Sequence, residues 1–353
     1  MDLAITKTST LKPHPADDKL GFGTHFTDHM FLMDYSKEKG WHNPRIAPYG
    51  PLTLDPSTMV FHYGQAIFEG LKAYRTKDDN IQLFRPQANL ARFNNSARRL
   101  CIPPIDEEFG LTCLKKLVDL ERAWVPKTDG TSLYIRPTII AADPFLGVRA
   151  SFTYTYFIIL SPVGAYYPEG FAPVKIWVSM SHVRAVPGGV GDAKTAGNYA
   201  ASLYAGEKAH QNGYTQVLWL DGVERRYVEE VGSMNIFFVI NGELVTPSLT
   251  GSILPGVTRD SVLKLAKHWN MPVSERRVSI DELFEAHAQG RLDECFGTGT
   301  AAVISPVGEL RYKESTISIS GGKVGPVAQK FYDAITDIQY GRSADPFGWI
   351  VPV

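Results

Sequence analysis

Cysteine is scarce in this sequence, and there is no excess of basic residues. The 353 residues include three cysteines, Cys101, Cys113 and Cys295, which are far apart and odd in number. They form neither a disulfide framework nor a Cys-x-x-Cys metal motif, so they favour a reducing compartment. Lys and Arg number 36 against 37 Asp and Glu, a net charge of −1. Such a balance cannot neutralise a phosphate backbone, which argues against nucleic acid as the main partner.

Long apolar runs are missing as well. The most apolar stretch, around residues 156–160, is far too short to span a bilayer. Residues 1–20 contain no apolar core and carry Asp17 and Asp18, so they do not resemble a secretory signal. These absences predict a soluble, cytoplasmic protein with no metal site, whose partners are small molecules.

The rest of the composition is ordinary for a folded protein, with 44% hydrophobic and 21% charged residues. The length suffices for two domains, each with its own core. Residues 162–170 are rich in Pro, Gly and Tyr, which is typical of a linker between domains. We predict a small N-terminal domain of residues 1–163, a linker of 164–173 and a larger C-terminal domain of 174–353.

Hydrophobic periodicity predicts an α/β (α+β) class for the whole chain. In the first half, β-rich runs predict strands at 59–63, 81–84, 132–141 and 151–161. Apolar residues at helical spacing predict helices at about 86–100 and 106–124. In the second half we expect strands at 174–180 and 215–220, a hairpin turning at Asn241-Gly242, and helices at about 199–211 and 257–269. Asn198 and Gly213 are expected to cap the first of these two helices.

A glycine-rich loop, residues 187–191, leads to Lys194 and allows three interpretations. A nucleotide-binding phosphate loop requires glycine directly before the lysine, and that position is Ala193. A solvated lysine on a flexible surface loop is the commonest outcome on spacing alone. The third interpretation is a lysine that forms a Schiff base, because burial lowers its pKa and exposes a nucleophilic amine. That chemistry also needs a carboxylate for a pyridinium nitrogen and donors for a phosphate.

The segment from Gly191 to Tyr199 resembles the cofactor-lysine segment of branched-chain amino acid aminotransferases, which are fold-type-IV pyridoxal-phosphate enzymes. Seven further blocks agree with that family in order and spacing: 26–30, 62–73, 83–86, 134–137, 228–235, 254–259 and 297–301. The resemblance covers roughly residues 20–350. It implies a two-domain fold whose larger C-terminal domain is β-barrel-like. Some family members carry a Cys-x-x-Cys motif where this sequence has Ala302 and Ser305, so a redox switch there is not expected.

The resemblance implies a site for pyridoxal 5′-phosphate. Lys194 would bond the cofactor and move a proton during the reaction, and Glu230 would keep the ring nitrogen protonated. Because Glu229 must point to the opposite face of the strand, we expect only one carboxylate of the pair to face inward. The phosphate and the rest of the cofactor would be held by Arg92, Tyr199, Ser233, Val257, Thr258 and Thr300. The unpaired N–H groups where a helix begins at Val257 suit a dianion. Taken alone, Arg92 would be a solvated helix arginine, Tyr199 a core aromatic and Asn198 a simple helix cap outside the site.

The resemblance further implies transamination of L-leucine, L-isoleucine and L-valine with 2-oxoglutarate. The substrate would be bound by Phe26, Tyr63, Tyr134, Arg136, Tyr166, Thr300 and Ala301. Leu146 and Val148 resemble a loop that closes the pocket of a neighbouring subunit, so a homodimer is implied. One methylene is worth about 1–3 kcal/mol of discrimination, so all three aliphatic substrates should be accepted.

Two groups of alternatives stay open. A D-amino-acid aminotransferase or an aminodeoxychorismate lyase would share the lysine and its carboxylate. A non-catalytic pyridoxal-phosphate-binding protein would keep the same motifs without turnover.

Overall fold

The computed structural model describes residues 1–164 and 170–353, which form two compact units. The first unit contains Met1–Tyr166, Ala193–Ala196 and Asp337–Val353, and the second contains Tyr167–Asp192 and Gly197–Thr336. Sequence analysis assigned residues 193–196 and 337–353 to the C-terminal domain, whereas both segments make their contacts within the first unit. The first unit is therefore assembled from three separate pieces of the chain.

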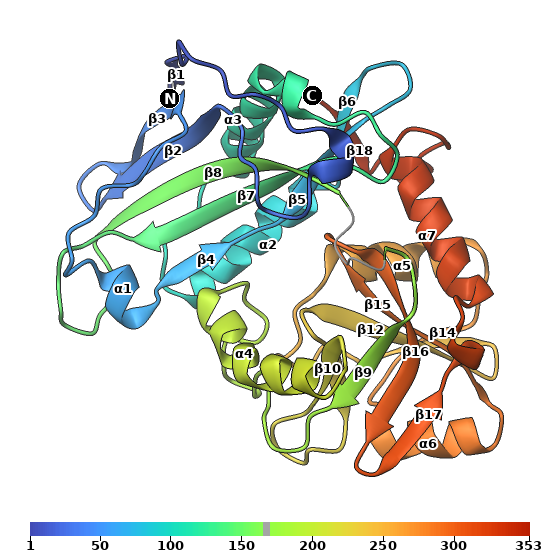
Figure 1. Ribbon diagram of the computed structural model, residues 1–353. Helices are drawn as coiled ribbons and strands as arrows, with labels where there is room; N and C mark the ends of the chain where they lie inside the picture. Colours follow the sequence, from blue (N-terminus) through green and yellow to red (C-terminus); the bar gives the residue numbers. More distant parts are fainter. Residues whose placement is uncertain (165–169) are drawn as a thin grey trace. The chain divides into compact units, whose positions relative to one another are not determined.

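The first unit is built on a mixed sheet (Figure 1). Its described strands run in the order β1-β3-β2-β8-β7-β5-β6-β18, and β4 pairs with β7 beside this path. Their bounds are Ala4–Ile5 (β1), His29–Ser36 (β2), Gly40–Pro48 (β3), Ala66–Phe68 (β4), Leu71–Arg75 (β5), Ile81–Phe84 (β6), Ser132–Ala141 (β7), Thr153–Val163 (β8) and Ile350–Pro352 (β18). The predicted strands at 81–84, 132–141 and 151–161 are confirmed, the first two with both ends correct.

Two helices, α2 (Pro86–Arg99) and α3 (Glu107–Leu120), pack against this sheet, and both were predicted. A 3-10 helix, η2 (Arg122–Trp124), follows α3. The core includes alternate residues of β7, namely Leu133, Ile135 and Ile139, together with apolar residues of both helices. Because side chains alternate along a strand, Tyr134 and Arg136 must point away from this core. The alternation thus leaves one face of β7 available for a binding site.

Residues 59–63 are not a strand, as predicted, but a short helix, α1 (Met59–Tyr63). The run of apolar, β-branched and aromatic residues resembles a strand, but local hydrogen bonds favour a turn. The Thr58 hydroxyl donates to the Asp55 carbonyl before the helix, and Gly64 ends it in the left-handed region with φ +61°. An L-residue adopts that conformation only with strain, so glycine suits the stop.

The second unit contains a sheet of the order β11-β10-β9-β16-β15-β12-β13-β14 among its described residues, with β17 paired to β16. The strands are Val174–Val178 (β9), Gln216–Leu220 (β10), Val228–Val231 (β11), Met234–Ile240 (β12), Glu243–Thr246 (β13), Val273–Glu275 (β14), Leu292–Gly299 (β15), Val303–Tyr312 (β16) and Ser315–Ser318 (β17). An additional pairing of β11 with β12 closes a ring of β9, β10, β11, β12, β15 and β16. This ring matches the expected barrel-like sheet, and Figure 1 shows β9, β12, β15 and β16 within it.

The helices of the second unit are α4 (Ala196–Gln211), α5 (Val257–His268), α6 (Ile280–Ala288) and α7 (Pro326–Gln339); the first residue of α4 and the last three of α7 belong to the first unit. The predicted hairpin is confirmed, since β12 and β13 pair across Asn241 and Gly242, which both have positive φ. Asn198 is not the N-cap that we predicted, because α4 already begins at Ala196. Its side-chain amide instead donates to the Val190 carbonyl at 2.8 Å, which ties the helix to the glycine-rich loop.

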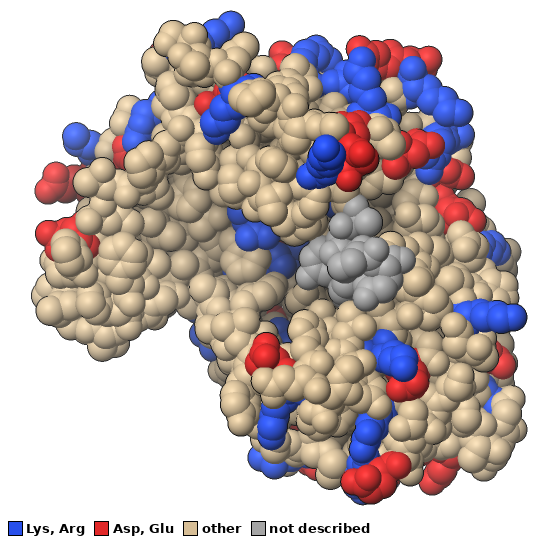
Figure 2. Space-filling model, in the orientation of Figure 1, with Lys and Arg blue, Asp and Glu red and all other residues tan. Residues whose placement is uncertain are grey.

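The surface carries both signs of charge. On the face drawn in Figure 2, basic and acidic side chains are interspersed and separated by uncharged surface. In the part of the chain that the structure describes, none of the helices combines the length and the apolar character needed to cross a membrane. The same residues contain no group of three or more His, Cys, Asp or Glu side chains placed to hold a metal ion.

Candidate active site

Lys194 is fixed by backbone contacts on both sides. Its amide donates to the Ser96 hydroxyl of α2 at 2.9 Å, and its carbonyl accepts from the Phe68 amide of β4 at 3.0 Å. The next residue, Thr195, forms a bridge with Ile67 and donates its hydroxyl to the Ala66 carbonyl. Lys194 therefore does not lie on the flexible surface loop that its spacing alone favoured.

The Lys194 amine is buried in the first unit, close to Arg92, Arg136 and Glu69. Burial, followed by the nearby positive charge of Arg92, lowers its pKa to about 8, although Glu69 acts in the opposite direction. The Nζ atom lies 4.8 Å from the centre of the Phe68 ring. A lysine in this state is partly neutral near physiological pH, which is what a nucleophilic amine requires.

Arg92 is buried and bound to Glu69. Its Nε and Nη2 donate to the two carboxylate oxygens of Glu69 at 2.7 and 2.9 Å, and Asn89 adds a third hydrogen bond at 2.9 Å. Burial raises the pKa of Glu69, but the charge and hydrogen bonds of Arg92 more than offset it, so the pKa is lowered. The interpretation of Arg92, taken alone, as a solvated arginine on a helix surface is therefore wrong. Sequence analysis gave no role to Glu69, although it lies within the quoted block 62–73.

The open face of β7 gathers further residues near the amine. Lys72 lies directly opposite Tyr134 in the β5–β7 pairing, so both side chains share this face. Burial lowers the pKa of Lys72 to about 8, so Lys72 is a second buried lysine whose amine is more easily neutral than usual. A Cβ atom at Gly70 would lie 2.0 Å from the Tyr134 hydroxyl, so only glycine lets that ring approach.

Arg136 is held beside Tyr134 and Phe68. Its Nη2 donates to the Tyr134 hydroxyl at 3.0 Å, and its guanidinium carbon lies 4.8 Å from the Phe68 ring centre. Its buried Nε has no hydrogen-bond acceptor among the described residues. Because a buried donor without a partner is costly, this atom indicates a place for an acidic ligand group. Phe68 was missed as a wall residue, although it lies in the quoted block 62–73.

The remaining predicted wall residues of this unit lie in different places. Phe26 stacks on Tyr49 at 5.3 Å, whereas it is Phe22 that contacts the Tyr134 ring, edge-on at 5.1 Å. Tyr63 donates its hydroxyl to the Leu146 carbonyl, which groups it with the exposed Leu146 and Val148. Tyr166 lies outside the described residues.

In the second unit, Glu230 and Glu229 are both buried, with 2% and 4% exposure. The expectation that only one of them faces inward is wrong, because the second face of β11 is covered too. There, Glu229 accepts a hydrogen bond from the Ser252 hydroxyl, and burial raises the pKa of the Glu229 carboxyl. On the other face, Glu230 accepts from the Leu254 amide at 2.9 Å and from the Asn235 side chain at 3.3 Å.

Arg184 is the charged partner of Glu230 and was not identified from the sequence. Its Nε lies 2.7 Å from a Glu230 carboxylate oxygen, and both side chains are almost fully buried. Its Nη2 donates to the carbonyls of Gly191 and Ser252. A guanidinium at this distance favours the ionised form of a carboxylate. The feature of the sequence that could have identified Arg184 is its position just before the glycine-rich loop.

A small cavity of about 20 Å³ lies beside this ion pair. Its lining contains Tyr199, Glu230 and Ser233, three of the residues expected to hold the cofactor, together with Asn198 and Arg184. Ser233 is exposed in the two-residue turn between β11 and β12. Asn198, which sequence analysis excluded from the site, is thus part of the same lining.

Two further expected phosphate ligands lie at the start of α5, which begins at Val257 as predicted. The close approach of this helix start to Asn235 requires glycine, since a Cβ at Gly256 would lie 2.0 Å from the Asn235 side-chain oxygen. Asn235 also donates to Glu230 and to the Leu254 carbonyl, so it connects the carboxylate to the segment that leads into α5. The expected ligands Thr300 and Ala301 lie in the turn between β15 and β16, and Asn235 pairs with Thr298 of β15.

Comparisons with known proteins agree with these features. The family model described as amino-transferase class IV matches residues 66–310. The chain is 60% identical over 351 residues to branched-chain-amino-acid aminotransferase 2 of Bacillus subtilis, covering 99% of this chain and 97% of that protein. It is 60% identical over 348 residues to branched-chain-amino-acid transaminase 1 of the same organism, covering 98% of each.

Solved structures show the same similarity. The crystal structure of the Escherichia coli branched-chain amino acid aminotransferase matches with a TM-score of 0.77 and 28% identity, covering 92% of this chain and 98% of that one. The T.th. branched-chain amino acid aminotransferase with pyridoxamine 5′-phosphate matches with a TM-score of 0.77 and 28% identity, covering 93% of this chain and 99% of that one.

Proposed function

Because this chain belongs to the class IV aminotransferases, we propose that it transfers the amino group of L-leucine, L-isoleucine and L-valine reversibly to 2-oxoglutarate. The chain is an enzyme of the fold-type-IV class, and its cofactor is pyridoxal 5′-phosphate. The observation that carries the proposal is Lys194, an amine with a pKa lowered to about 8 and a backbone held on both sides.

Each unit, considered by itself, contains residues that fit part of this cofactor. The first unit supplies the amine of Lys194 for the aldehyde and the guanidinium of Arg92, already oriented by Glu69, for the phosphate. The second unit supplies the Glu230 carboxylate for the ring nitrogen and the N–H groups at the start of α5 for the phosphate. Tyr199 and Ser233 line the cavity next to Glu230 and would contact the ring and its substituents.

When bound, the cofactor supplies an electron-withdrawing ring that weakens bonds at the substrate α-carbon. The chain's own residues then do the rest. Lys194 would supply the amine for the aldehyde of the cofactor, and the same amine would carry the proton that leaves the substrate α-carbon. Glu230 would keep the ring nitrogen protonated, because Arg184 and the Leu254 amide stabilise the ionised carboxylate.

One pocket must accept an aliphatic and an acidic substrate in turn. Phe68 and Tyr134 supply apolar surface beside Lys194, and Phe26 is proposed to add to it. The side-chain carboxylate of glutamate would bind the Nε of Arg136, the buried donor that has no acceptor in the described part of the chain. Thr300 and Ala301 are proposed to bind the substrate α-carboxylate through their amides, and Tyr166 to complete the wall.

The test is an assay of purified protein with L-leucine and 2-oxoglutarate. We expect formation of glutamate and 4-methyl-2-oxopentanoate, with similar turnover of L-isoleucine and L-valine. Turnover of D-alanine instead would support a D-amino-acid aminotransferase, and release of pyruvate from aminodeoxychorismate would support the lyase. Bound cofactor without any turnover would support a non-catalytic binding protein.

We also propose that two copies of the chain form a homodimer in the cytoplasm, in a role in branched-chain amino acid biosynthesis. The support is an exposed apolar patch on the first unit, formed by Phe61, Tyr63, Phe145, Leu146, Val148 and Phe152. Tyr63 is hydrogen-bonded to Leu146, and Arg149 lies over the rings of both Phe145 and Phe152, so several of these side chains are neighbours. Exposed apolar groups that gather in this way commonly mark an interface. Leu146 and Val148 would reach the neighbouring subunit's pocket. The three cysteines are unpaired, as expected in a reducing compartment.

The substitution Val148→Asp tests the dimer. Val148 is 85% exposed, so the change should leave the folded monomer intact while placing a charge in the interface. We expect analytical ultracentrifugation to show a shift from dimer to monomer, with a parallel loss of L-leucine turnover. The control is Val223→Asp, at a valine of the second unit that is 74% exposed and lies outside the patch. A Val148→Asp protein that stays dimeric and fully active would contradict the assignment.

A further inference from the structure

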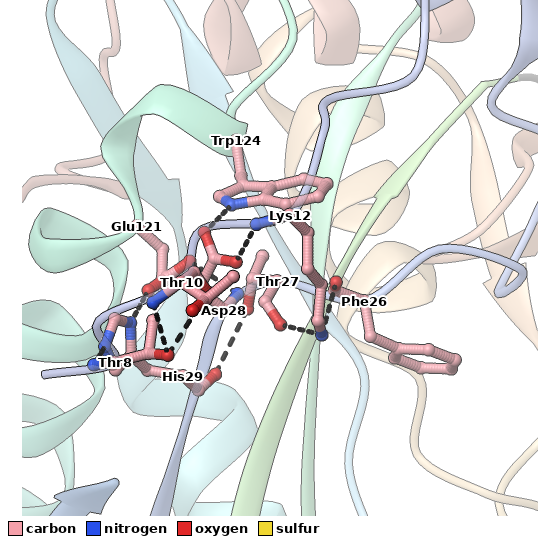
Figure 3. A network of polar contacts seen from close by, with 9 residues as sticks. All are labelled: Thr8, Thr10, Lys12, Phe26, Thr27, Asp28, His29, Glu121 and Trp124. Carbon is pink, nitrogen blue, oxygen red and sulfur yellow. Dashed lines mark hydrogen bonds and ion pairs between the residues drawn. The ribbon is translucent and has the colours of Figure 1, made fainter. Parts of the chain in front are cut away.

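The segment Phe26–His29 is held by an extended polar network (Figure 3). The network joins this segment to two others that are distant in sequence. One is the N-terminal strap, which we define as residues 8–12, and the other is the corner between α3 and η2, with Glu121 and Trp124. All of these residues belong to the first unit.

The buried part of the network fixes Asp28 and His29. Asp28 accepts from the Trp124 ring nitrogen and from the Lys12 amide, both at 2.8 Å, and its own amide donates to Glu121 at 3.0 Å. The other Glu121 oxygen contacts Nδ1 of His29. Because Nε2 of His29 accepts from the Thr8 amide at 2.9 Å, the ring proton must lie on Nδ1 and be donated to Glu121. The donor and the acceptor are therefore defined for each hydrogen bond of this cluster.

The exposed end of the network acts directly on Phe26. The Lys12 ammonium donates to the carbonyls of Phe26 and Thr27 at 3.2 and 2.8 Å. It also lies 4.3 Å above the ring of Tyr49, which itself stacks on the Phe26 ring at 5.3 Å with an interplanar angle of 9°. One ammonium group thus restrains Phe26 twice, through its backbone and through the ring beneath it.

We infer that Lys12 is a positioning residue for substrate binding, which acts through Phe26. The inference rests on the proposed function, in which Phe26 is a wall of the pocket for aliphatic side chains. The N-terminal strap then forms part of the binding apparatus without touching substrate. Small displacements of a wall residue matter, because a shift of about 1 Å at a substrate-positioning residue can change the rate up to about a hundredfold.

The test compares kcat and KM for L-leucine in the holoenzyme. Lys12→Met keeps the length of the side chain but removes its donors and its charge. We expect KM to rise roughly fivefold, with kcat within about twofold of the unmodified enzyme. The rise in KM should stay below the hundredfold limit given above, because the buried contacts of Asp28 still hold the segment. Lys12→Arg, which keeps the donors and the charge, should have a KM close to that of the unmodified enzyme. The control is Lys7→Met, at an exposed lysine just before the strap, which should match the unmodified enzyme.

A double-mutant cycle separates positioning from a purely structural role. Phe26→Ala alone should raise KM, and adding Lys12→Met to it should change KM no further, because both substitutions remove the same wall. Equal KM values for Lys12→Met and Lys7→Met would overturn the inference. The inference would also be overturned if Lys12→Met changed KM by the same factor in the Phe26→Ala protein as in the unmodified enzyme. In both cases the unmodified enzyme still turns over L-leucine, whereas failure of the proposed function would show as no turnover in any variant.

Discussion

Lys194→Ala is expected to lose the yellow colour of the bound cofactor and to lower kcat by about 10⁴-fold or more, because it removes both the point of attachment and the proton carrier. Absorbance spectra and single-turnover assays with L-leucine measure the two effects. The matched control is Lys72→Met, since Lys72 is also buried and also has a pKa lowered to about 8. Its shift has burial as its cause, whereas that of Lys194 also reflects the charges of Arg92 and Glu69.

The same prediction has a pH dependence with a definite sign. Only the neutral amine attacks an aldehyde, and burial lowers the pKa of Lys194 from 10.5 to about 8. The rate of cofactor attachment to the apoprotein should therefore rise with pH up to about 8 and then level off. An ordinary lysine would give a rate that keeps rising toward pH 10.5. If Lys72→Met lost the colour and Lys194→Ala kept it, the cofactor would be attached to Lys72, and the proposed site would be refuted.

Glu230→Gln is expected to lower kcat by roughly 10²–10³-fold, the size of effect seen when one charged or polar group is removed from a preorganised site. A neutral amide cannot hold the ring nitrogen in its protonated form. Breaking a buried ion pair also costs about 3–5 kcal/mol of stability. We expect the lower end here, because Arg184 keeps its hydrogen bonds to the carbonyls of Gly191 and Ser252.

Glu229→Gln provides the matched control on the same strand. Burial raises the pKa of Glu229, which makes the charged carboxylate less favourable there and reduces the cost of replacing it with the neutral amide of glutamine. We expect Glu229→Gln to keep most of the activity and to melt close to the unmodified enzyme. Melting curves and cofactor content measured on both variants separate a catalytic defect from unfolding. Equal losses of kcat in the two variants would mean that Glu230 has no special role.

Local patterns predicted much of the fold because their physical signals are local. The alternation along 132–141 and the turn residues Asn241 and Gly242 each determine a short element without help from distant residues. The error at 59–63 has the same origin. A run of five mostly apolar residues does not distinguish a strand from one helical turn, and the hydrogen bond from Thr58 to Asp55 decides the outcome.

The site was harder to predict, because it depends on pairs that lie far apart in sequence. Glu69 binds Arg92, 23 residues away, and no periodic pattern marks either residue. Arg184 and Glu230 form an ion pair across two different segments, and Arg184 was missed. The family resemblance located Lys194, Arg92 and Glu230, but their partners could be identified only from the three-dimensional contacts. Phe68 was missed for the same reason, since its contact with Lys194 arises from the pairing next to β4.

The discontinuous first unit has a consequence for biosynthesis on the ribosome. Its sheet is completed by β18, which pairs with β6, and the Tyr340 hydroxyl donates to the Thr131 carbonyl. These residues are translated after the entire second unit, so the nascent second unit can acquire its native packing while the first still lacks an edge strand. The lysine segment Ala193–Ala196 likewise emerges long after β4, to which it binds. Vectorial synthesis therefore makes the unit that begins first the one that is finished last.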